Sequence, residues 1–461
     1  MNQQFTATLT SGDIKRHIPH TFTVPAHCTK VAIHFHYAPR NVSGMTNLLT
    51  LTLFDPDGFR GAGHRGGDTH EVAITPTSAT RGYLPGALPA GEWTVQVDTH
   101  MVLPGDPVHY TIDVTVESDP NATLTPLPRV QPDFSRVVNP NPGWYRGDLH
   151  SHTLHSDASW TPQDLVAAAR QQGLDFIALT DHNTISPLAE MATLGDDQLL
   201  TLGGQELTTF WGHAVCLGAH DAWIDWRVDR EGRSMTTIAT QLYAKGQLYI
   251  IAHPYAIGDP YCTGCRWLYT AMMPGTARLI EVWNGPWFGD HPLEHNCNED
   301  GLAFYYRCLN EGRQLVMTAG SDAHGPKHYE RGPGFNVVYA EALSEQGILR
   351  GLAAGHSYLS VGPVLHLQAE TAGGDTAMMG DLLPTAAHTD FMVTSNWSAA
   401  STGATLRLIV NGAVYAKAEV AAEGRQDWRV PVHGTRWCTV ELRAANGSML
   451  AITNPVFLSR A

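Results

Sequence analysis

The sequence predicts an α/β domain, most simply a barrel, between two β-sandwich domains. Three patterns support this fold class: period-two apolar alternation over residues 1–135, apolar runs alternating with amphipathic helices over 136–362, and strand patterns again over 363–461. The 461-residue chain also exceeds the size that one hydrophobic core usually supports, which favours several domains.

The N-terminal segment shows the strand signals most clearly. In KVAIHFHY (30–37) and YTIDVTVE (110–117) every second residue is apolar, and DPDG (55–58) is typical of a turn. We therefore expect a β-sandwich over 1–135. Six prolines lie within 117–143, which predicts a semi-rigid linker or a strap across a neighbouring domain.

The middle segment alternates strands and helices. The apolar runs 175–180, 247–252, 277–283 and 314–320 predict strands, and the amphipathic stretches 161–173, 235–246, 299–312 and 344–355 predict helices. Such alternation indicates parallel strands with helical crossovers, and the number of repeats favours a barrel. The C-terminal segment returns to strands, and Asn411-Gly412 predicts a tight hairpin within a second, Ig-like sandwich.

Composition narrows the class of protein. Hydrophobic residues make up 43% and charged residues 16%, which excludes global disorder. The formal net charge of −15 opposes binding to nucleic acid or to an anionic membrane surface. No leader-like or membrane-spanning apolar run is evident and the seven cysteines are scattered, so we expect a cytoplasmic protein without a disulfide framework.

Ligand-type side chains follow the predicted strands of the middle segment. Functional groups gather at the carboxyl ends of strands in parallel α/β folds, so we expect these side chains to meet. The residues in question are His150, His152, Asp181, His182, Glu206, His253, Glu281, Asn284, Asp322 and His324.

Two spacings indicate shared metal ions. His150 and His152 lie two residues apart, so both imidazoles of an extended segment point to one side, and Asp322 and His324 repeat this spacing. Imidazoles and carboxylates without thiolates suit zinc, manganese or iron. The donors outnumber the four that one tetrahedral ion needs, which predicts a site for two or three divalent ions.

The motifs GDLHSHTLHSDA, LTDHNT, GQE, AHP and GSDAH, in this order, resemble those of the PHP (polymerase and histidinol phosphatase) superfamily of metal-dependent hydrolases. GHAVCLG, EVWNG, HSYLSVGP and TNPVFL further resemble the CehA/McbA-type branch. The resemblance implies a distorted (β/α)7 barrel that binds two or three metal ions over about residues 144–362, with a weaker resemblance in the C-terminal domain.

The resemblance also implies a ligand set. One metal ion would be held by His150, His152, Glu206 and Asp322, a second would share Glu206 and take His253, and a third would take Asp157, His182 and His324. His213 either completes the second metal site or contacts substrate. Asp181 and His155, which are catalytic candidates together with His324, are expected to support the ligands or to contact substrate, since ligating imidazoles need acceptors behind them.

Charge arithmetic favours an anionic substrate. Three divalent ions against three carboxylates leave the pocket floor cationic, which attracts a small-molecule phosphoester. The predicted reaction is phosphoester hydrolysis, with phosphodiesters favoured, by metal-bound hydroxide, and the leaving alcohol would take a proton from His324 or His155. Asn284, Arg266 and Lys327 are further candidates for substrate binding.

Three other functions remain open at this stage. The same hydroxide could attack a carbamate, ester or amide carbonyl, as in the carbaryl-hydrolase type. An oligonucleotide exonuclease is a second alternative, although no basic stripe accompanies the motifs. The third is a non-catalytic module that binds a glycan or a protein.

Two other motifs point to different chemistry. GAGHRG (61–66) has the G-x-G-x-x-G spacing but follows a turn and precedes a strand, so we interpret it as a glycine-rich loop without a nucleotide. CTGC (262–265) is interpreted as a loop disulfide or two packed thiols, with a zinc site including Cys297 or His295 as the alternative.

Overall fold

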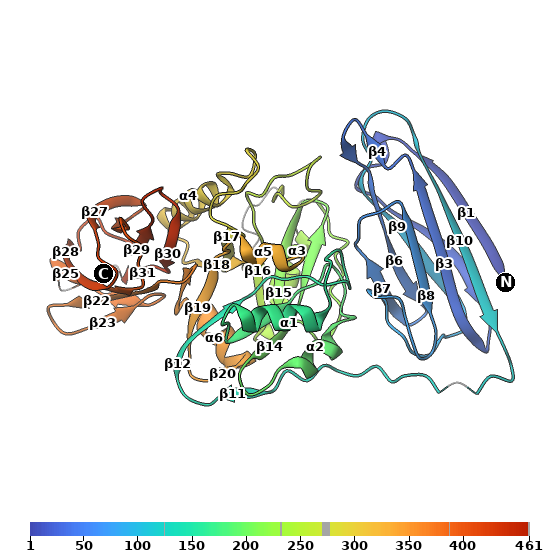
Figure 1. Ribbon diagram of the computed structural model, residues 1–461, viewed down its shortest axis with the longest axis horizontal. Coiled ribbons are helices and arrows are strands. Elements are labelled where there is room, and N and C mark those ends of the chain that lie inside the picture. Colours follow the sequence, from blue (N-terminus) through green and yellow to red (C-terminus); the bar gives the residue numbers. More distant parts are fainter. Residues whose placement is uncertain (124, 231–232, 270–276, 387, 460–461) are drawn as a thin grey trace.

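The computed structural model describes residues 1–123, 125–230, 233–269, 277–386 and 388–459. The molecule is elongated, with β-rich parts at both ends and a mixed α/β part between them (Figure 1). The middle part is the one that carries the predicted ligand residues, so its packing against both ends decides how the site is enclosed.

The N-terminal part consists of two antiparallel sheets around one core. The strand orders are β1-β10-β3-β8 and β2-β9-β6-β7. Along β3, Val31, Ile33, Phe35 and Tyr37 are buried whereas the intervening residues face outward, as the period-two pattern predicts. The elements are β1 (Asn2–Leu9), a 3-10 helix (Ser11–Asp13), β2 (His17–Val24), β3 (Cys28–Ala38), β4 (Asn41–Val42), β5 (Met45–Thr46), β6 (Leu48–Asp55), β7 (Gly58–Gly63), β8 (Thr69–Ile74), β9 (Gly91–Met101) and β10 (Val108–Ser118).

The proline-rich segment that follows lies across its neighbours. The backbone N–H of Leu127 donates to the carbonyl of Pro76 at 2.8 Å, which ties the segment to the N-terminal sheets. Phe134 is buried and packs over Gly203 of the middle part. Figure 1 shows the segment passing along one side of the molecule between the two parts.

The middle part is a mixed α/β fold, as predicted. Its strands are β11 (Val137–Asn139), β12 (Gly143–Asp148), β13 (Phe176–Leu179), β14 (Leu200–Thr209), β15 (Gly212–Leu217), β16 (Leu248–Ile251), β17 (Leu279–Asn284), β18 (Val316–Gly320), β19 (Phe335–Ala340), β20 (Leu343–Ser344) and β21 (Ser357–Ser360). Its helices are α1 (Pro162–Gln171), α2 (Leu188–Leu194), α3 (Arg233–Ala244), α4 (Cys297–Asn310), α5 (Pro326–Glu330) and α6 (Glu345–Ala354).

Capping residues that the sequence shows mark the ends of two helices, α1 and α6. Thr161 caps α1 by accepting from the N–H of Asp164, whose carboxylate returns the bond in a capping box. Gly355 ends α6 with a φ of 74°, a left-handed conformation that favours glycine.

The middle sheet is not uniformly parallel, which corrects the prediction from the alternating pattern. The pairs β12–β13, β13–β14, β16–β17 and β17–β18 are parallel, but β15 is antiparallel to both β14 and β16. The reason is a tight connection, Phe210–Trp211, that returns the chain from β14 directly into β15 without a helical crossover.

The sheet also continues beyond the middle part. Strand β21 pairs with β30, so one continuous sheet runs from β18 through β12, β19 and β21 to β27. At its other end β18 approaches β19 through the buried side chain of Asn336, which donates to Ala319 O at 2.7 Å and accepts from Ala319 N at 3.0 Å. A closed (β/α)7 barrel stays a prediction.

The C-terminal part packs a second sheet, β23-β22-β25-β28, against the continuation of the first. Its strands are β22 (Val364–Thr371), β23 (Thr376–Met378), β24 (Leu382–Pro384), β25 (Asp390–Ser398), β26 (Thr405–Val410), β27 (Ala413–Glu419), β28 (Gly424–Pro431), β29 (Trp437–Arg443), β30 (Met449–Thr453) and β31 (Val456–Ser459). Asn411 and Gly412 join β26 to β27 with φ values of 49° and 82°, as a tight hairpin turn requires.

The N-terminal sheets dock on the middle part through polar and aromatic contacts. Lys15 pairs with Asp259 at 2.7 Å, and the rings of Phe59 and Trp223 stack at 4.2 Å. Thr184 Oγ1 donates to the carbonyl of Gly82 at 2.8 Å. These contacts hold the two parts in a defined relative position.

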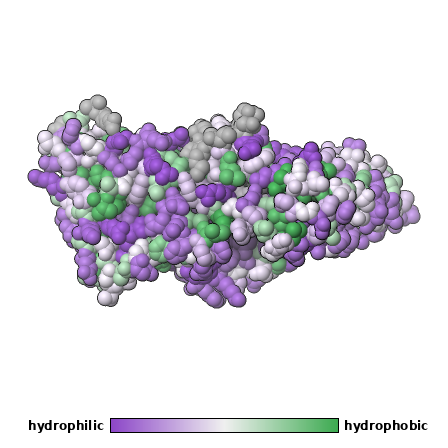
Figure 2. Space-filling model, turned by 90° about the horizontal axis from the view of Figure 1, so that it is seen from above, coloured by the Kyte–Doolittle hydropathy of each residue, from purple (hydrophilic) through white to green (hydrophobic). Residues whose placement is uncertain are grey.

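Hydrophilic residues cover most of the face seen in Figure 2, and hydrophobic residues form small separate groups on it. No helix within the described residues is both long and apolar enough to cross a lipid bilayer.

Replacing Asn336 by Ala tests the contact between β18 and β19. The change leaves both backbone groups of Ala319 without their buried partner, so we expect the free energy of unfolding to fall by about 2–4 kcal/mol. Denaturant unfolding measures the loss, and Asn121→Ala in the exposed proline-rich segment is the control, with a change within about 0.5 kcal/mol. Equal stability of the two variants would contradict the assigned role of Asn336.

Candidate metal centre

Two loops carrying His150 and Asp322 are tied together by one buried carboxylate at the end of β12. Asp148 accepts from the backbone N–H of Ser321 at 3.0 Å, from Ser321 Oγ at 2.5 Å and from the hydroxyl of Tyr329 at 2.9 Å. Asp148 also accepts from the N–H of His150 at 3.3 Å. The carboxylate therefore fixes the ends of β12 and β18 next to each other.

The first group consists of His150, His152, Glu206 and Asp322. The Nε2 atoms of His150 and His152 lie 3.2 and 3.3 Å from Glu206 Oε2. They lie 3.5 and 3.0 Å from Asp322 Oδ1. The structure thus brings together the four residues expected to hold one metal ion.

The second group consists of His152, Asp157, His182 and His324. Asp157 Oδ1 lies 3.1 Å from His324 Nε2 and 3.5 Å from His182 Nε2. The rings of His152 and His182 stack at 4.2 Å, so the second group adjoins the first. These positions agree with the predicted third metal site, with His152 as an additional donor.

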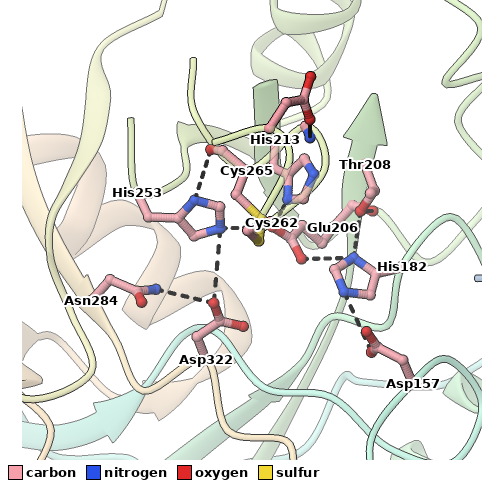
Figure 3. Close-up of a disulfide and its surroundings, with 12 residues drawn as sticks. Asp157, His182, Glu206, Thr208, His213, His253, Cys262, Cys265, Asn284 and Asp322 are labelled. Carbon is pink, nitrogen blue, oxygen red and sulfur yellow. Dashed lines mark hydrogen bonds and ion pairs between the residues drawn. A yellow bond between two sulfur atoms is a disulfide. The ribbon is translucent and has the colours of Figure 1, made fainter. Parts of the chain in front are cut away.

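His213 and His253 both approach the other oxygen of Glu206 (Figure 3). His213 Nδ1 lies 3.0 Å and His253 Nε2 lies 3.2 Å from Glu206 Oε1. His182, Glu206 and His213 form a third possible metal-binding group, whereas His253 is in none of the three. Both imidazoles thus adjoin Glu206, and His213, whose role the sequence left open, is the one that lies in a group of donors within 4.8 Å of one another.

Several nitrogen and oxygen atoms in this cluster are buried without a hydrogen-bond partner among the described residues. They are Nε2 of His150, both ring nitrogens of His152, Oε2 of Glu206 and Nε2 of His213. Buried polar atoms normally have partners, and these atoms converge at ion-pair distances without hydrogen-bond geometry. Imidazole and carboxylate donors arranged in this way fit divalent metal ions such as zinc, manganese or iron.

The electrostatics of the cluster point in the same direction. Burial alone would raise the pKa of Glu206, but the imidazoles of His150, His182 and His213 hold it well below the usual range. Burial likewise opposes ionisation of Asp157 and Asp322, yet neighbouring histidines keep both carboxyl pKa values well below normal. The three carboxylates are thus ionised and require cationic neighbours.

The pKa values of the histidines depend on where each imidazole lies in the cluster. Burial and the adjoining imidazoles lower the pKa of His152 to about 3. Burial also works against protonation of His324 and His253, but the carboxylates beside them prevail and raise these pKa values to about 10 and about 9. Glu206, His150 and His152 form a buried floor, whereas Asp157, Asp322 and His324 are partly exposed at the rim.

Two residues of the cluster have unusual backbone conformations. His253 has a φ of 23° and Asp322 a φ of 52°, in the left-handed region that non-glycine residues rarely adopt. Such strain persists only where the surrounding structure enforces it, and it concentrates at functional sites.

Other side chains orient the donors. Glu281 accepts from His150 Nδ1 at 2.9 Å, and Thr208 bonds to His182 Nδ1. Asn284 donates to Glu281 at 2.5 Å and to Asp322 at 3.4 Å. Glu281 was visible at a strand end, but only the fold shows that its partner is His150.

The structure places the predicted catalytic residues Asp181 and His155 away from the donors. Asp181 is fully buried and accepts from Thr153 and Ser156, so it shapes the loop that carries His152. His155 Nδ1 bonds to Ser186 Oγ at 2.8 Å, on the side facing α2. Burial, Arg81 and Arg65 lower its pKa to about 4, which leaves no proton to donate at neutral pH.

Two cavities open on the metal centre, and both are lined by His253, Asp322 and His324. Asn284 lines the first cavity, together with His328 and Arg331. Arg266 and Lys327 are exposed and line neither cavity, so the structure does not bring these two predicted substrate ligands to the cluster. His64, from the glycine-rich loop that we interpreted as binding no nucleotide, lines the second cavity.

The CTGC segment forms a disulfide, Cys262–Cys265, beside the cluster (Figure 3). The carbonyl of Cys265 accepts from His253 Nδ1 at 3.2 Å, so this loop helps to orient His253. The disulfide agrees with the first interpretation of this motif.

Replacing Glu281 by Gln tests the support of His150. The neutral amide accepts more weakly from Nδ1, so we expect metal affinity to fall about 10–100-fold, and Glu206→Gln to reduce it further. Elemental analysis and metal titration of the purified variants measure this. Glu341→Gln, on an exposed carboxylate, is the matched control, and unchanged metal content in Glu206→Gln would contradict the ligand assignment.

His155 provides a pH-dependent test of its burial. The unfolded chain binds a proton below about pH 6.5 whereas folded His155 resists it down to about 4, so its contribution to stability is lost as the pH falls through this range. Replacement by Gln should reduce the loss of stability between pH 7 and 4.5 by about 2–3 kcal/mol, measured by denaturant unfolding. The control is His36→Gln on exposed β3, and identical pH slopes for all three proteins would contradict the burial argument.

The chain is similar to several characterised proteins over a short stretch. It is 39% identical over 67 residues to the 5'-3' exoribonuclease Rnm of Escherichia coli, a match covering 14% of this chain and 23% of that protein. It is 35% identical over 80 residues to the 3',5'-nucleoside bisphosphate phosphatase of Chromobacterium violaceum, covering 16% and 28%. The chain thus spans about a quarter of the length of these curated relatives.

Among solved structures, a two-domain protein from Bacteroides vulgatus, described as containing a predicted PHP-like metal-dependent phosphoesterase, aligns with a TM-score of 0.38 and 18% identity. The alignment covers 71% of this chain and 100% of that one. Residues 148–225, which hold six of the donors described above, match the family model of the PHP domain.

Proposed function

We propose that this protein is a metal-dependent phosphoester hydrolase. The observation that carries the proposal is the convergence of eight donors, Glu206 and Asp322 among them, from five loops and strands, with several of their buried nitrogen and oxygen atoms lacking a hydrogen-bond partner among the described residues. The PHP domain match and the phosphoester-cleaving relatives named above support the same reaction class.

The positions of the donors assign them to two separate metal ions. His150, His152, Glu206 and Asp322 would hold one divalent ion, and Asp157, His182 and His324 another, with Glu206 and His213 between them. Bound divalent ions lower the pKa of water and neutralise phosphoryl oxygens. Because three carboxylates balance only part of that charge, the floor of the site would attract an anionic phosphoester.

His324 is the side chain best placed to move a proton. Its side chain is 27% exposed, at the rim shared by both cavities, and Asp157 lies 3.1 Å from Nε2. Nε2 of His324 cannot both ligate a metal ion and donate a proton to a leaving alcohol. A His324→Gln protein that keeps its full metal content but loses turnover would assign His324 to proton transfer.

A nucleolytic activity is the second candidate, because one of the relatives that match a short stretch of this chain is a 5'-3' exoribonuclease. The net charge of −15 opposes tight binding of a long nucleic acid backbone. We therefore favour small phosphomonoesters and phosphodiesters, and place short oligonucleotides after them.

Turnover by metal-loaded protein tests the proposal. We expect hydrolysis of p-nitrophenyl phosphate or bis(p-nitrophenyl) phosphate, loss of activity with a chelator, and recovery with Mn²⁺, Zn²⁺ or Fe²⁺. Asp322→Asn should lower kcat/KM by about 10³-fold, because it removes a charge shared by His150 and His152.

The matched control is Asp375→Asn, on a turn of the C-terminal part far along the chain from the cluster, and it should retain full activity. Hydrolysis of 1-naphthyl carbamate without hydrolysis of either phosphoester would replace the proposal by the carbamate alternative. An unchanged rate in Asp322→Asn would refute the site itself.

A further inference from the structure

The N-terminal sheets contribute a wall of the metal centre. Strand β7 ends at Gly63, and the ring of the next residue, His64, lies 4.6 Å from the ring of His182. His64 and Arg65 line the second cavity together with Asp157, His182 and His324. A loop about 90 residues before the first metal-binding motif thus adjoins the metal ligands.

This loop is held in place by close backbone contacts. The N–H of Ala62 donates to Gly82 O at 3.1 Å, and the N–H of Gly82 donates to Ser186 Oγ of the middle part at 3.1 Å. A side chain at Gly82, where φ is +90°, would lie 2.4 Å from Ala62 O and 2.9 Å from Arg65 Nη2. The packing at Gly82 therefore fixes the position of Arg65 relative to the metal centre.

Among the described residues, two cations of this wall form no ion pair. Arg65 donates to the carbonyl of Arg81 at 2.5 Å, and its buried Nε has no hydrogen-bond partner within the described part of the chain. Arg40 lines the same cavity, with Nη2 3.6 Å from the position that a Cβ on Gly66 would occupy. In the described regions neither guanidinium forms an ion pair, whereas Arg60 of the same sheets is paired with Asp55.

The charge of these side chains identifies the kind of ligand. Both arginines are half-buried and line a cavity that is also lined by Asp157, His182 and His324. A guanidinium binds phosphate through two parallel N–H donors, and such charge-assisted bonds are among the stronger polar contacts in proteins. An anion seated at the metal centre could place a second anionic group against these two side chains.

We propose that Arg40 and Arg65 form an anion subsite that binds a second phosphate group of the substrate, one that is not hydrolysed. This inference rests on the proposed phosphoester hydrolysis and narrows its substrate class to compounds with two phosphate groups. His64 fills the space between the arginine loop and His182 and acts as a positioning residue. The N-terminal sheets would thereby select the substrate while the middle part carries out the reaction.

Equilibrium binding of phosphonates, which cannot be hydrolysed, tests the subsite without relying on turnover. Metal-loaded full-length protein is titrated calorimetrically with methylphosphonate and with diphosphonates whose phosphorus atoms are joined by one or three carbons. We expect Arg65→Gln and Arg40→Gln each to weaken binding of the better diphosphonate about 10–100-fold and to change methylphosphonate binding less than about threefold. Arg65→Lys should lose less, because it keeps the charge but not the planar fork.

Lys30→Gln is the matched control, since it removes one positive charge from the same sheets. Lys30 forms an ion pair with Glu117. Thermal unfolding verifies that each variant remains folded. Equal weakening of both ligand types, or no weakening of either, would overturn the subsite while leaving the hydrolase proposal in place. If the wild-type protein bound no phosphonate and cleaved no phosphoester, both proposals would fall.

Discussion

The site depends on the burial of one carboxylate. Glu206 is inaccessible to solvent, and five imidazoles, those of His150, His152, His182, His213 and His253, lie within 3.3 Å of its two oxygens. A buried carboxylate is unfavourable unless positive charge accompanies it. The imidazoles, and the metal ions that we propose they hold, provide that charge.

The sheet makes this convergence possible. Glu206 lies on β14. The neighbouring strand β13 leads to His182, and β15 on the other side carries His213. Farther out in the sheet, the ends of β12 and β18 bring His150 and Asp322 to the same cluster. Asp148 ties those two ends together with buried hydrogen bonds. The antiparallel return of β15, which departs from a regular α/β repeat, pairs His213 with Thr208 and so brings its ring to within 3.0 Å of Glu206, two residues away on β14.

The site lies where the chain's parts meet. The loop at His64 from the N-terminal sheets and the disulfide loop at 262–265 both line the second cavity, and Lys15 pairs with Asp259, three residues before the disulfide loop. Enclosure by several segments excludes water from the floor while Asp157, Asp322 and His324 remain accessible at the rim. The chemistry and the selection of substrate can therefore come from different parts of the chain.

The sequence alone determined the elements with local signals. The Thr161 cap, the Gly355 stop and the Asn411-Gly412 turn depend on residues adjacent in the chain, and the His150/His152 spacing puts two imidazoles on one side of any extended segment. Donors at successive strand ends predicted a shared centre because strand ends meet in an α/β sheet.

Only the tertiary structure decided which donors face one another and what encloses them. Nothing local to His64 or Arg40 relates them to a metal centre, since their approach depends on how the N-terminal sheets dock. Likewise, His155 and Asp181 have the residue types of a catalytic acid and base, but hydrogen bonds to Ser186, Thr153 and Ser156 orient them elsewhere. Side-chain direction and contacts between distant segments follow from packing over the whole chain, and the chemistry of a single motif does not contain them.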